Sequence, residues 1–507
     1  MTTKPKLIAV VGATGTGKSE LAVSVASHFN GEILNADAMQ LYTGLPVITN
    51  KIPVSERCGI PHHLLGCIGL DEQPWTVGKF VSSALETIEE IRARGKLPIL
   101  VGGTHYYTQS LLFKDALADE AKGNVDVSGE DQNETSDVLS NGRVYEDIKT
   151  RYPVLDAPTA EILAKLQEVD PVMAERWHPN DRRKIQRSLE IWLQTGRRAS
   201  DIYAEQKGRR GVDTNGTGEP EDVEVVSEKT VKEHLDTPSG LRMDTLLFWV
   251  HAQTDTLYDR LNGRVDKMMN EGLMSEVEEL SSYAKTHPDL DQTSGIWVSI
   301  GYKEFLPYIK HTEQEDAQAT VQKPENESIR TETAQDDALS KKLLSEGVEA
   351  TKAGTRQYAK RQVRWIRIKL MNALQSARPV GEGVLYVLDG SDISRFQEDV
   401  LTKAQNLSER WLKGDEMPDP ASVSQVAEEL LKPKREDLSN SVGKWERQFC
   451  TVCKVVGVTP SDWDLHVKSR RHRRNIAKVK EQDGVRNYQH EEQTGVELQK
   501  ESNKTTN

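Results

Sequence analysis

Eight residues near the beginning of the chain constrain its fold more than any other feature. Positions 12–19 read Gly-Ala-Thr-Gly-Thr-Gly-Lys-Ser, which matches G-x-x-x-x-G-K-[ST]. The apolar run Leu7–Val11 before them predicts a buried strand, and the apolar spacing in Ser19–Phe29 after them predicts a helix. In this context glycine backbone amides and a helix N-terminus hold phosphate groups. The motif therefore predicts a phosphate-binding loop in an α/β fold.

The loop also predicts which residues contact the phosphates. Lys18 supplies a positive charge, and Ser19 supplies a hydroxyl that can ligate Mg²⁺. We expect a di- or triphosphate to contact Gly12, Thr14, Gly15, Thr16, Gly17, Lys18 and Ser19. A distant run, Val384–Asp389, has the shape of a strand ending in a Mg²⁺-binding carboxylate. It also reads as an edge strand that ends in a turn.

Strand and helix patterns alternate along most of the chain. The expected strands continue at Glu32–Ala36, Pro98–Val101, Thr245–Ala252 and Val384–Leu388. The expected helices are Val77–Arg94, Thr159–Val169, Asp181–Gln194, Thr256–Met269, Leu273–Tyr283, Thr355–Ala373 and Ile393–Leu412. This alternation predicts a P-loop NTPase-like parallel sheet flanked by helices, over residues 1–410, with a helical insertion at about 115–205.

The net charge of −13 is unevenly distributed along the 507 residues. Residues 116–150, 207–240 and 311–349 carry net charges of −6, −3 and −6, so the remaining chain is slightly basic. These segments are poor in aromatic residues, and such compositions bury too little apolar surface to fold. We therefore expect disordered insertions at about 116–145, 207–240 and 311–338. The acidic total does not argue against a nucleic-acid partner.

Two polar residues follow the second and third expected strands. Asp37 ends the second, and Thr104 follows Gly102 and Gly103 after the third. Because ligands bind at the carboxyl ends of parallel strands, both would lie beside the phosphate loop. Asp37 could take a proton from an acceptor, or could cap a helix or ligate Mg²⁺. Thr104 could line the site or serve only the turn.

Several stretches together make the chain resemble the tRNA dimethylallyltransferase (tRNA isopentenyltransferase) family of the eukaryotic type. They are Gly12–Ser19, Asp37–Tyr42, Ile48–Lys51, Gly59–His63, Val101–Thr104, Ser299–Tyr302 and Thr355–Arg361. Their order and spacing are highly specific. Two departures stand out, since family members often carry Ser where this chain has Ala38, and bacterial members carry Arg where it has Lys303.

The resemblance implies a reaction and a set of roles. A dimethylallyl group would pass from dimethylallyl diphosphate to N6 of the adenosine 3′-adjacent to the anticodon, giving N6-isopentenyladenosine. Asp37 matches the general base and Thr104 the channel hydroxyl. Contacts with the tRNA anticodon stem-loop would involve Asp37, Ala38, Met39, Gln40, Thr104 and Lys303. Rival interpretations are a transferase that acts on free adenine nucleotides, a P-loop small-molecule kinase, and a non-catalytic RNA-binding adaptor.

Two basic helices favour a polymeric acceptor. One contains Arg183, Lys184, Ile185, Gln186 and Arg187, in a stretch that resembles the family's tRNA-contacting segment. On the other, Arg356, Lys360 and Arg364 form an i, i+4, i+8 stripe suited to a phosphate backbone. Either stripe could instead be a solvated surface.

A cysteine–histidine module follows a charged linker predicted at 411–444. Cys450, Cys453, His466 and His472 have the spacing of a tetrahedral zinc finger over about 445–475, for which Zn²⁺ would be structural. Phe449 and Leu465 would supply a minimal core. The surrounding Lys and Arg residues favour RNA, although a protein partner is open. We expect a disordered tail at 476–507, and we expect Cys58, His62, His63 and Cys67 to serve packing.

Composition excludes several classes of protein. The chain has no apolar run of the ~18–20 residues that a membrane span needs, so we expect no membrane partner. Four cysteines are too few for a disulfide scaffold, and the N-terminus lacks a secretory or transit pattern. We expect a cytoplasmic monomer that starts at Met1. Additional mitochondrial or nuclear pools of the protein are an open alternative.

Overall fold

The computed structural model describes residues 4–113, 151–203, 240–321, 329–376, 384–432, 448–453, 455–457 and 460–482. The chain divides into two compact units, one comprising 1–130 and 206–436 and the other 131–205 and 437–507. The predicted insertion at 116–145 and nearly all of the one at 207–240 lie outside the described residues. So do most of the predicted tail and the end of the predicted linker.

Six parallel strands form the sheet of the first unit, in the order β3-β2-β4-β1-β5-β6. The strands are β1 (Lys6–Gly12), β2 (Gly31–Asn35), β3 (His62–His63), β4 (Leu97–Val101), β5 (Asp244–His251) and β6 (Val384–Asp389). The central strands are almost continuously apolar because helices cover both faces of the sheet. The predicted α/β class is confirmed.

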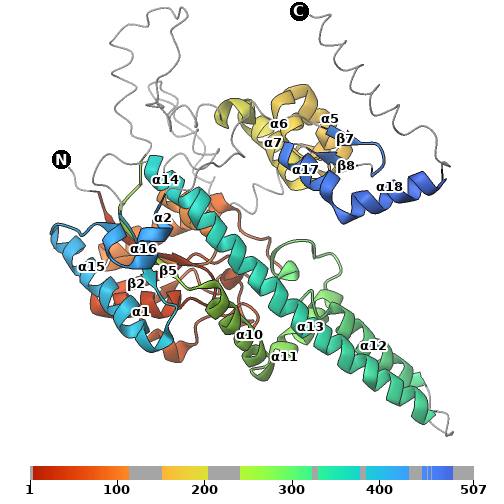
Figure 1. Ribbon diagram of the computed structural model, residues 1–507, viewed down its shortest axis with the longest axis horizontal. Coiled ribbons are helices and arrows are strands. Elements are labelled where there is room, and N and C mark those ends of the chain that lie inside the picture. The colour runs from red at the N-terminus through yellow and green to blue at the C-terminus, as the bar shows by residue number, and fades with distance from the viewer. Residues whose placement is uncertain are drawn as a thin grey trace, which may run out of the picture. The chain divides into compact units, whose positions relative to one another are not determined.

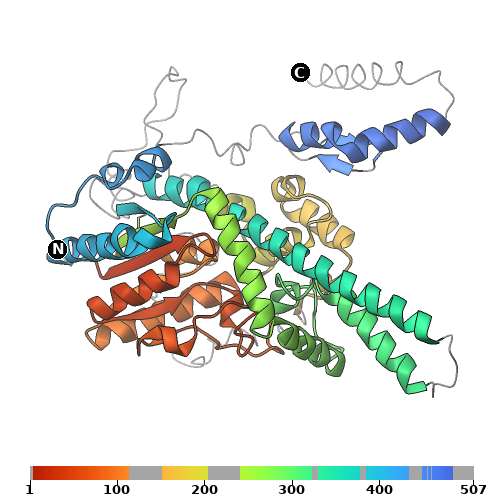
Figure 2. The same cartoon turned by 60° about the horizontal axis from the view of Figure 1, so that its bottom comes forward.

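Alternate side chains of each strand enter two separate apolar layers. In β1, Leu7, Ala9 and Val11 face one layer, and Ile8 and Val10 face the other. The first layer is covered by α2 (Val77–Ala93), α3 (His105–Leu112) and α11 (Leu273–Thr286), and the second by α1 (Lys18–His28) and α15 (Lys403–Lys413). Figure 2 shows helices above and below the strands. All loops that follow the carboxyl ends of the strands therefore meet at one edge.

Helix α13 (Ile329–Trp365) runs beside the sheet and extends beyond it, with α12 (Leu306–Val321) packed against it (Figure 1). It continues through a π-helical turn (Ile366–Leu370) into α14 (Met371–Ser376). The expectation of disorder at 311–338 is therefore wrong up to Val321 and from Ile329. A low aromatic content does not exclude helices here, because the Ala, Glu and Gln of this segment have good helix propensity and the two helices pack against each other.

The segment after β6 belongs to the core. It contains short 3₁₀ helices at Ile393–Arg395 and Pro420–Ser422, a π helix at Gln397–Thr402, and α16 (Gln425–Leu430). Ala427 and Leu430 of α16 are buried against the first layer. The linker predicted to begin at 411 is thus wrong for these residues, because apolar positions three apart on one helix face outweigh the charges between them.

The second unit contains helices α5 (Thr159–Val169), α6 (Pro171–Arg176) and α7 (Arg182–Thr195), which pack on one another. Its C-terminal module has a hairpin, β7 (Gln448–Cys450) and β8 (Val455–Gly457), followed by α17 (Pro460–Lys468) and α18 (Arg470–Gln482). Because α18 continues to Gln482, the tail predicted from 476 begins too early. Phe449 and Leu465 are 54% and 68% exposed, so they do not form the predicted minimal core.

The remaining described elements are helix α10 (Thr254–Asn270) and 3₁₀ turns at Met39–Leu41, Val54–Arg57, Pro153–Asp156 and Gly295–Val298. Among the described residues, no helix has the length and apolar character needed to cross a membrane. The cytoplasmic location stays a prediction.

Candidate active site

The phosphate loop joins β1 to α1 in the predicted position. Gly15 and Gly17 have φ angles of 80° and 87°, which favour glycine. A Cβ on Gly17 would lie 2.8 Å from Cε2 of Phe396, so the loop has no room for a larger residue there. The Thr16 hydroxyl donates to the Ala13 carbonyl at 2.9 Å. These constraints fix a tight loop at the N-terminus of α1.

Two cations lie at this loop. Lys18 Nζ donates to the Ala13 carbonyl at 2.7 Å, and Arg264 Nη1, from α10, donates to Thr14 Oγ1 at 2.6 Å. Burial lowers the pKa of Lys18 to about 8 and that of Arg264 to about 10. Within the described part of the chain, Arg264 Nε is buried and has no hydrogen-bond partner. Two desolvated cations with an open donor form a cradle for a multiply charged anion.

Arg264 is a candidate site residue that the sequence did not single out. It lies about 250 residues from the loop in sequence, within an amphipathic helix where basic residues are common. Only the packing of α10 reveals it: Leu257 and Leu261, on that helix, are buried against Ala13 of the loop. A helix that packs on the loop in this way can deliver a side chain to it.

Asp37 follows β2 and is held by local hydrogen bonds. Its Oδ1 accepts from the Met39 amide at 3.1 Å, and its own amide donates to Asn35 Oδ1 at 3.0 Å. Removal from water raises the pKa of Asp37, while the Met39 amide and the charge of Lys18 oppose that rise. Asp37 interacts electrostatically with both Lys18 and Arg264. The predicted base and the phosphate cradle therefore share one site.

Thr104 lies on the same sheet edge, at the N-cap of α3. Its Oγ1 accepts from the Ala38 amide at 3.0 Å, which joins the loop after β4 to the loop after β2. Gly103 is close-packed, because a Cβ there would lie 2.8 Å from Asp37 Oδ2. The structure thus brings together the two predicted catalytic residues, Asp37 and Thr104.

Helix α13 forms one wall of this site through Gln362, which is 3% exposed. Gln362 Oε1 accepts from the Thr14 amide at 2.8 Å, and its Nε2 donates to the Gly103 carbonyl at 2.9 Å. Tyr358 Oη, one turn earlier, lies 3.4 Å from the same carbonyl. Gln362 was not predicted as a site residue, because periodicity does not reveal what a buried amide contacts.

A buried histidine supports the loop from below. His105 Nε2 accepts from the Gly12 amide at 3.4 Å. Burial and the nearby Lys18 charge lower the pKa of His105 to about 3, so its imidazole is neutral. A neutral ring can accept this hydrogen bond without adding a third positive charge to the site.

The remaining predicted RNA contacts of the first unit lie around this edge or on α13. Gln40 Nε2 donates to the Asn50 carbonyl at 3.0 Å, so its amide organises the neighbouring loop. Lys360 and Arg364 are exposed, whereas Arg356 is partly buried and contacts Asn262. Lys303 is exposed and lies 3.8 Å from Glu304.

In the second unit, α7 presents only part of the predicted basic segment. Arg183 is exposed, and Lys184 pairs with Asp181 at 2.7 Å. Arg187 lies 3.4 Å from Glu190, and Gln186 donates to the same residue at 3.0 Å. Ile185 has no exposed surface, so its side chain is not available for a contact with RNA, and the predicted role of this stretch rests on its polar residues.

The four predicted finger ligands converge. One ligand atom from each of Cys450, Cys453, His466 and His472 lies within 4.8 Å of the others, so this group could hold a metal ion. His472 Nδ1 lies 3.5 Å from Cys450 Sγ and 3.4 Å from Cys453 Sγ. A tetrahedral site with the usual Zn–S and Zn–N bond lengths has S···N edges of about 3.5 Å. Donor types and spacing thus suit Zn²⁺.

The other candidate positions have structural partners. His63 and Arg94 both contact the buried carboxylate of Glu32 at 2.7 Å, and His62 contacts the Ile60 carbonyl. Asp389 Oδ1 accepts from the Ser391 amide at 3.0 Å, which is the turn alternative.

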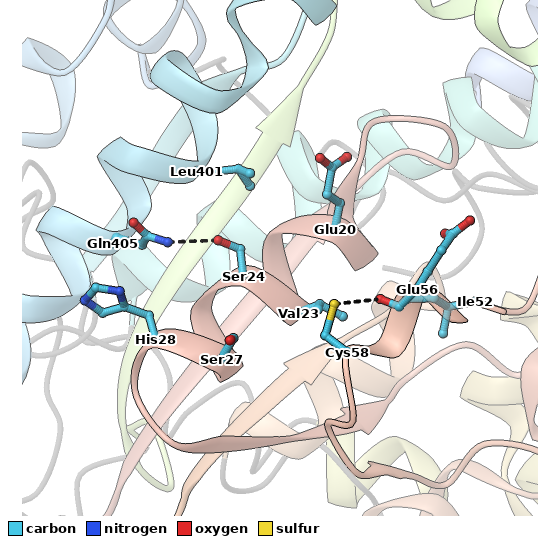
Figure 3. A pocket seen from close by; sticks show the side chains of 10 residues that line it. All are labelled: Glu20, Val23, Ser24, Ser27, His28, Ile52, Glu56, Cys58, Leu401 and Gln405. Atoms are coloured by element: carbon cyan, nitrogen blue, oxygen red, sulfur yellow. Dashed lines mark hydrogen bonds between the residues drawn. The ribbon is translucent and has the colours of Figure 1, made fainter. Parts of the chain in front are cut away.

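A cavity of about 710 Å³ lies along α1 and is lined also by Gln405 of α15 and by the turn that contains Glu56 and Cys58 (Figure 3). Its lining includes Glu20, Ser24, Cys58 and Gln405, and Gln405 Nε2 donates to Ser24 Oγ at 3.0 Å. None of the predicted site residues lines this cavity.

Fold and site together define a phosphate-loop α/β protein in which a carboxylate and a hydroxyl face a cationic cradle. The profile of a family described as IPP transferase matches residues 40–369, and the chain belongs to this family. The resemblance seen in the sequence is therefore confirmed. The matched range begins after the phosphate loop at residues 12–19.

Individual relatives extend the match to most of the chain. It is 30% identical to tRNA dimethylallyltransferase of Saccharomyces cerevisiae, over 93% of this chain and 92% of that protein. For the Schizosaccharomyces pombe protein of the same name the identity is 32%, over 94% and 96%. A solved structure of a eukaryotic dimethylallyltransferase acting on tRNA aligns with a TM-score of 0.65 at 30% identity, covering 94% of this chain and 98% of that one.

Proposed function

We propose that this protein transfers a dimethylallyl group from dimethylallyl diphosphate to N6 of the adenosine 3′-adjacent to the anticodon in tRNA. The observation that carries the proposal is the placement of Asp37 beside Lys18 and Arg264. A base and an anion cradle at one sheet edge are what a diphosphate donor and a weakly nucleophilic amine require. The names of the relatives support the same transferred group and a tRNA acceptor.

The chemistry assigns a separate task to each side of the site. The N6 lone pair attacks C1 of the dimethylallyl group, and the C1–O bond breaks with its electron pair leaving on pyrophosphate. Lys18 and Arg264 stabilise the charge that develops on the leaving group, where desolvated cations act most strongly. Asp37 accepts the N6 proton, and its raised pKa makes the carboxylate a better base. Thr104 orients the acceptor channel through its bond with Ala38.

The RNA contacts follow from charge and exposure. Lys303, Lys360 and Arg364 offer exposed cations in the first unit, and Arg183 does so in the second. Such side chains can bind the phosphates of the anticodon stem-loop. A small-molecule acceptor would not need them, which favours tRNA over free nucleotides.

Two metal ions complete the proposal. Ser19 is exposed in the first turn of α1, and its hydroxyl would hold Mg²⁺ together with diphosphate oxygens and water. Mg²⁺ there would neutralise charge on the leaving pyrophosphate. Cys450, Cys453, His466 and His472 would hold a Zn²⁺ that stabilises the finger. The basic side chains on α18 suit RNA, and a protein partner for the finger is the alternative.

The test is incubation with labelled dimethylallyl diphosphate and total tRNA, with free AMP as a competing acceptor. We expect label in tRNA, at the adenosine 3′ of the anticodon, and no effect of AMP. Label in AMP would establish the free-nucleotide alternative. Stabilisation of the protein by ATP, without stabilisation by dimethylallyl diphosphate, would establish the kinase alternative.

A further inference from the structure

Two aromatic side chains meet where α3 begins and α13 ends. The rings of Tyr106 and Trp365 lie 5.9 Å apart at an interplanar angle of 67°, an edge-to-face contact. The Trp365 indole N–H donates to Gln109 Oε1 at 3.0 Å, which fixes the orientation of that ring. Tyr106 nevertheless leaves 45% of its surface exposed. The ring of Tyr106 is thus partly exposed to solvent while Trp365 packs against it.

This pair lies close to Thr104 along α3 and close to Tyr358 along α13. Tyr106 is two residues beyond Thr104, in the first turn of α3. On α13, Tyr358, Arg361 and Trp365 are spaced i, i+3 and i+7 and so share one face. Tyr358 contacts Gly103 and Thr104 at one end of this face, and Trp365 contacts Tyr106 at the other. Between them Arg361 is exposed.

An exposed aromatic ring, in contact with a tryptophan that lies one helical turn from an exposed arginine, matches one nucleotide of single-stranded RNA. The ring can stack on a base, which every base permits, and the guanidinium can bind the adjoining phosphate. Extrusion of one base from an RNA loop also deprives its neighbours of a stacking partner. An exposed ring close to Thr104, such as that of Tyr106, can replace the lost stacking partner.

We propose that Tyr106, braced by Trp365, stacks on the nucleobase adjacent to the modified adenosine while Arg361 contacts its phosphate. This inference rests on the proposed function, because it needs an RNA acceptor at Thr104 and Asp37. A pair that served packing alone would bury Tyr106, as Tyr107 next to it is buried against Phe80. If Tyr106 stacks on a base, it contributes to the affinity for RNA and does not contribute to the affinity for the diphosphate donor.

The experiment uses the full chain and an anticodon stem-loop with 2-aminopurine on either side of the target adenosine. In the wild type, binding should change the fluorescence of one of the two probes. Tyr106→Ala should weaken RNA binding about 5- to 150-fold and abolish that change. Tyr106→Phe should retain both, because the ring remains. Binding of inorganic pyrophosphate should be equal in all variants.

A control separates stacking from general loss of exposed apolar surface. Ile393 is 68% exposed, lies on the turn after β6 and has no assigned role. Ile393→Ala should bind RNA as the wild type does. If the wild type modifies tRNA but Tyr106→Ala keeps its affinity and its probe signal, the stacking inference is overturned while the proposed function stands. A wild type that neither binds nor modifies tRNA would overturn both.

Discussion

Replacement of Asp37 by Asn should separate the chemical step from donor binding. The amide is nearly isosteric but cannot accept the N6 proton, and loss of a general base costs about 10²–10⁴-fold in rate. That range corresponds to about 2.7–5.5 kcal/mol of transition-state stabilisation. The same change removes a negative charge that interacts with Lys18 and Arg264. Pyrophosphate should therefore bind Asp37→Asn at least as tightly as it binds the wild type.

The assay is single-turnover transfer with labelled donor, together with calorimetric titration of pyrophosphate. Asp389 offers a matched control, because it is also a carboxylate at the carboxyl end of a strand of this sheet but bonds only Ser391 in the described contacts. Asp389→Asn should transfer normally. A near-normal rate in Asp37→Asn refutes the general-base role. Equal losses in both variants would instead favour Asp389 as a Mg²⁺ ligand.

Three further predictions follow from the charges, the packing and the metal group. Because burial lowers the pKa of Lys18 to about 8, pyrophosphate should restore its proton on binding near pH 8–9. Calorimetry in buffers of different ionisation enthalpy should show that the wild type takes up more protons on binding pyrophosphate than Lys18→Arg does. The pyrophosphate affinity of the wild type should also fall more steeply with rising pH. Gly347→Ala should lower the free energy of unfolding by about 1–3 kcal/mol, because the methyl group would lie 2.6 Å from buried Phe305. Gly263→Ala should raise the free energy of unfolding by up to about 1 kcal/mol, because Gly263 lies in a helix and has open space around it. Denaturant titration measures both changes. Cys450→Ser should release bound Zn²⁺, detected with a chromogenic chelator, and should leave transfer to a short anticodon stem-loop intact; loss of that activity would contradict a finger separate from the catalytic fold.

The phosphate loop and the sheet could be predicted because their signals are local. The motif at 12–19 specifies its own strand and helix, and buried parallel strands read as apolar runs whatever lies beside them. Asp37 and Thr104 could be placed together because the carboxyl ends of parallel strands share one edge. Each of these inferences needs only the residues of one strand and the loop after it.

The errors arise where long-range packing decides the structure. Composition marked 311–338 as disordered, but α12 and α13 form helices that pack against each other. The sequence around α16 predicts a linker because charged residues outnumber the two apolar positions, Ala427 and Leu430, that are buried in the core. Arg264 is indistinguishable from the other basic residues of α10 until the helix is placed on the phosphate loop. These properties depend on which elements become neighbours, which periodicity does not encode.

Helix α13 links the two halves of the proposed reaction through one buried side chain. Gln362 uses both ends of its amide, accepting from Thr14 in the phosphate loop and donating to Gly103 beside Asp37 and Thr104. The same turns of the helix expose Lys360, Arg361 and Arg364, the side chains suited to RNA. A buried amide that lost either partner would leave a backbone group unsatisfied, at a cost of about 1–3 kcal/mol. A shift of the helix relative to the phosphate loop would therefore also strain its contact beside Asp37 and Thr104, so one element holds the phosphate loop, these two residues and the exposed cations in register.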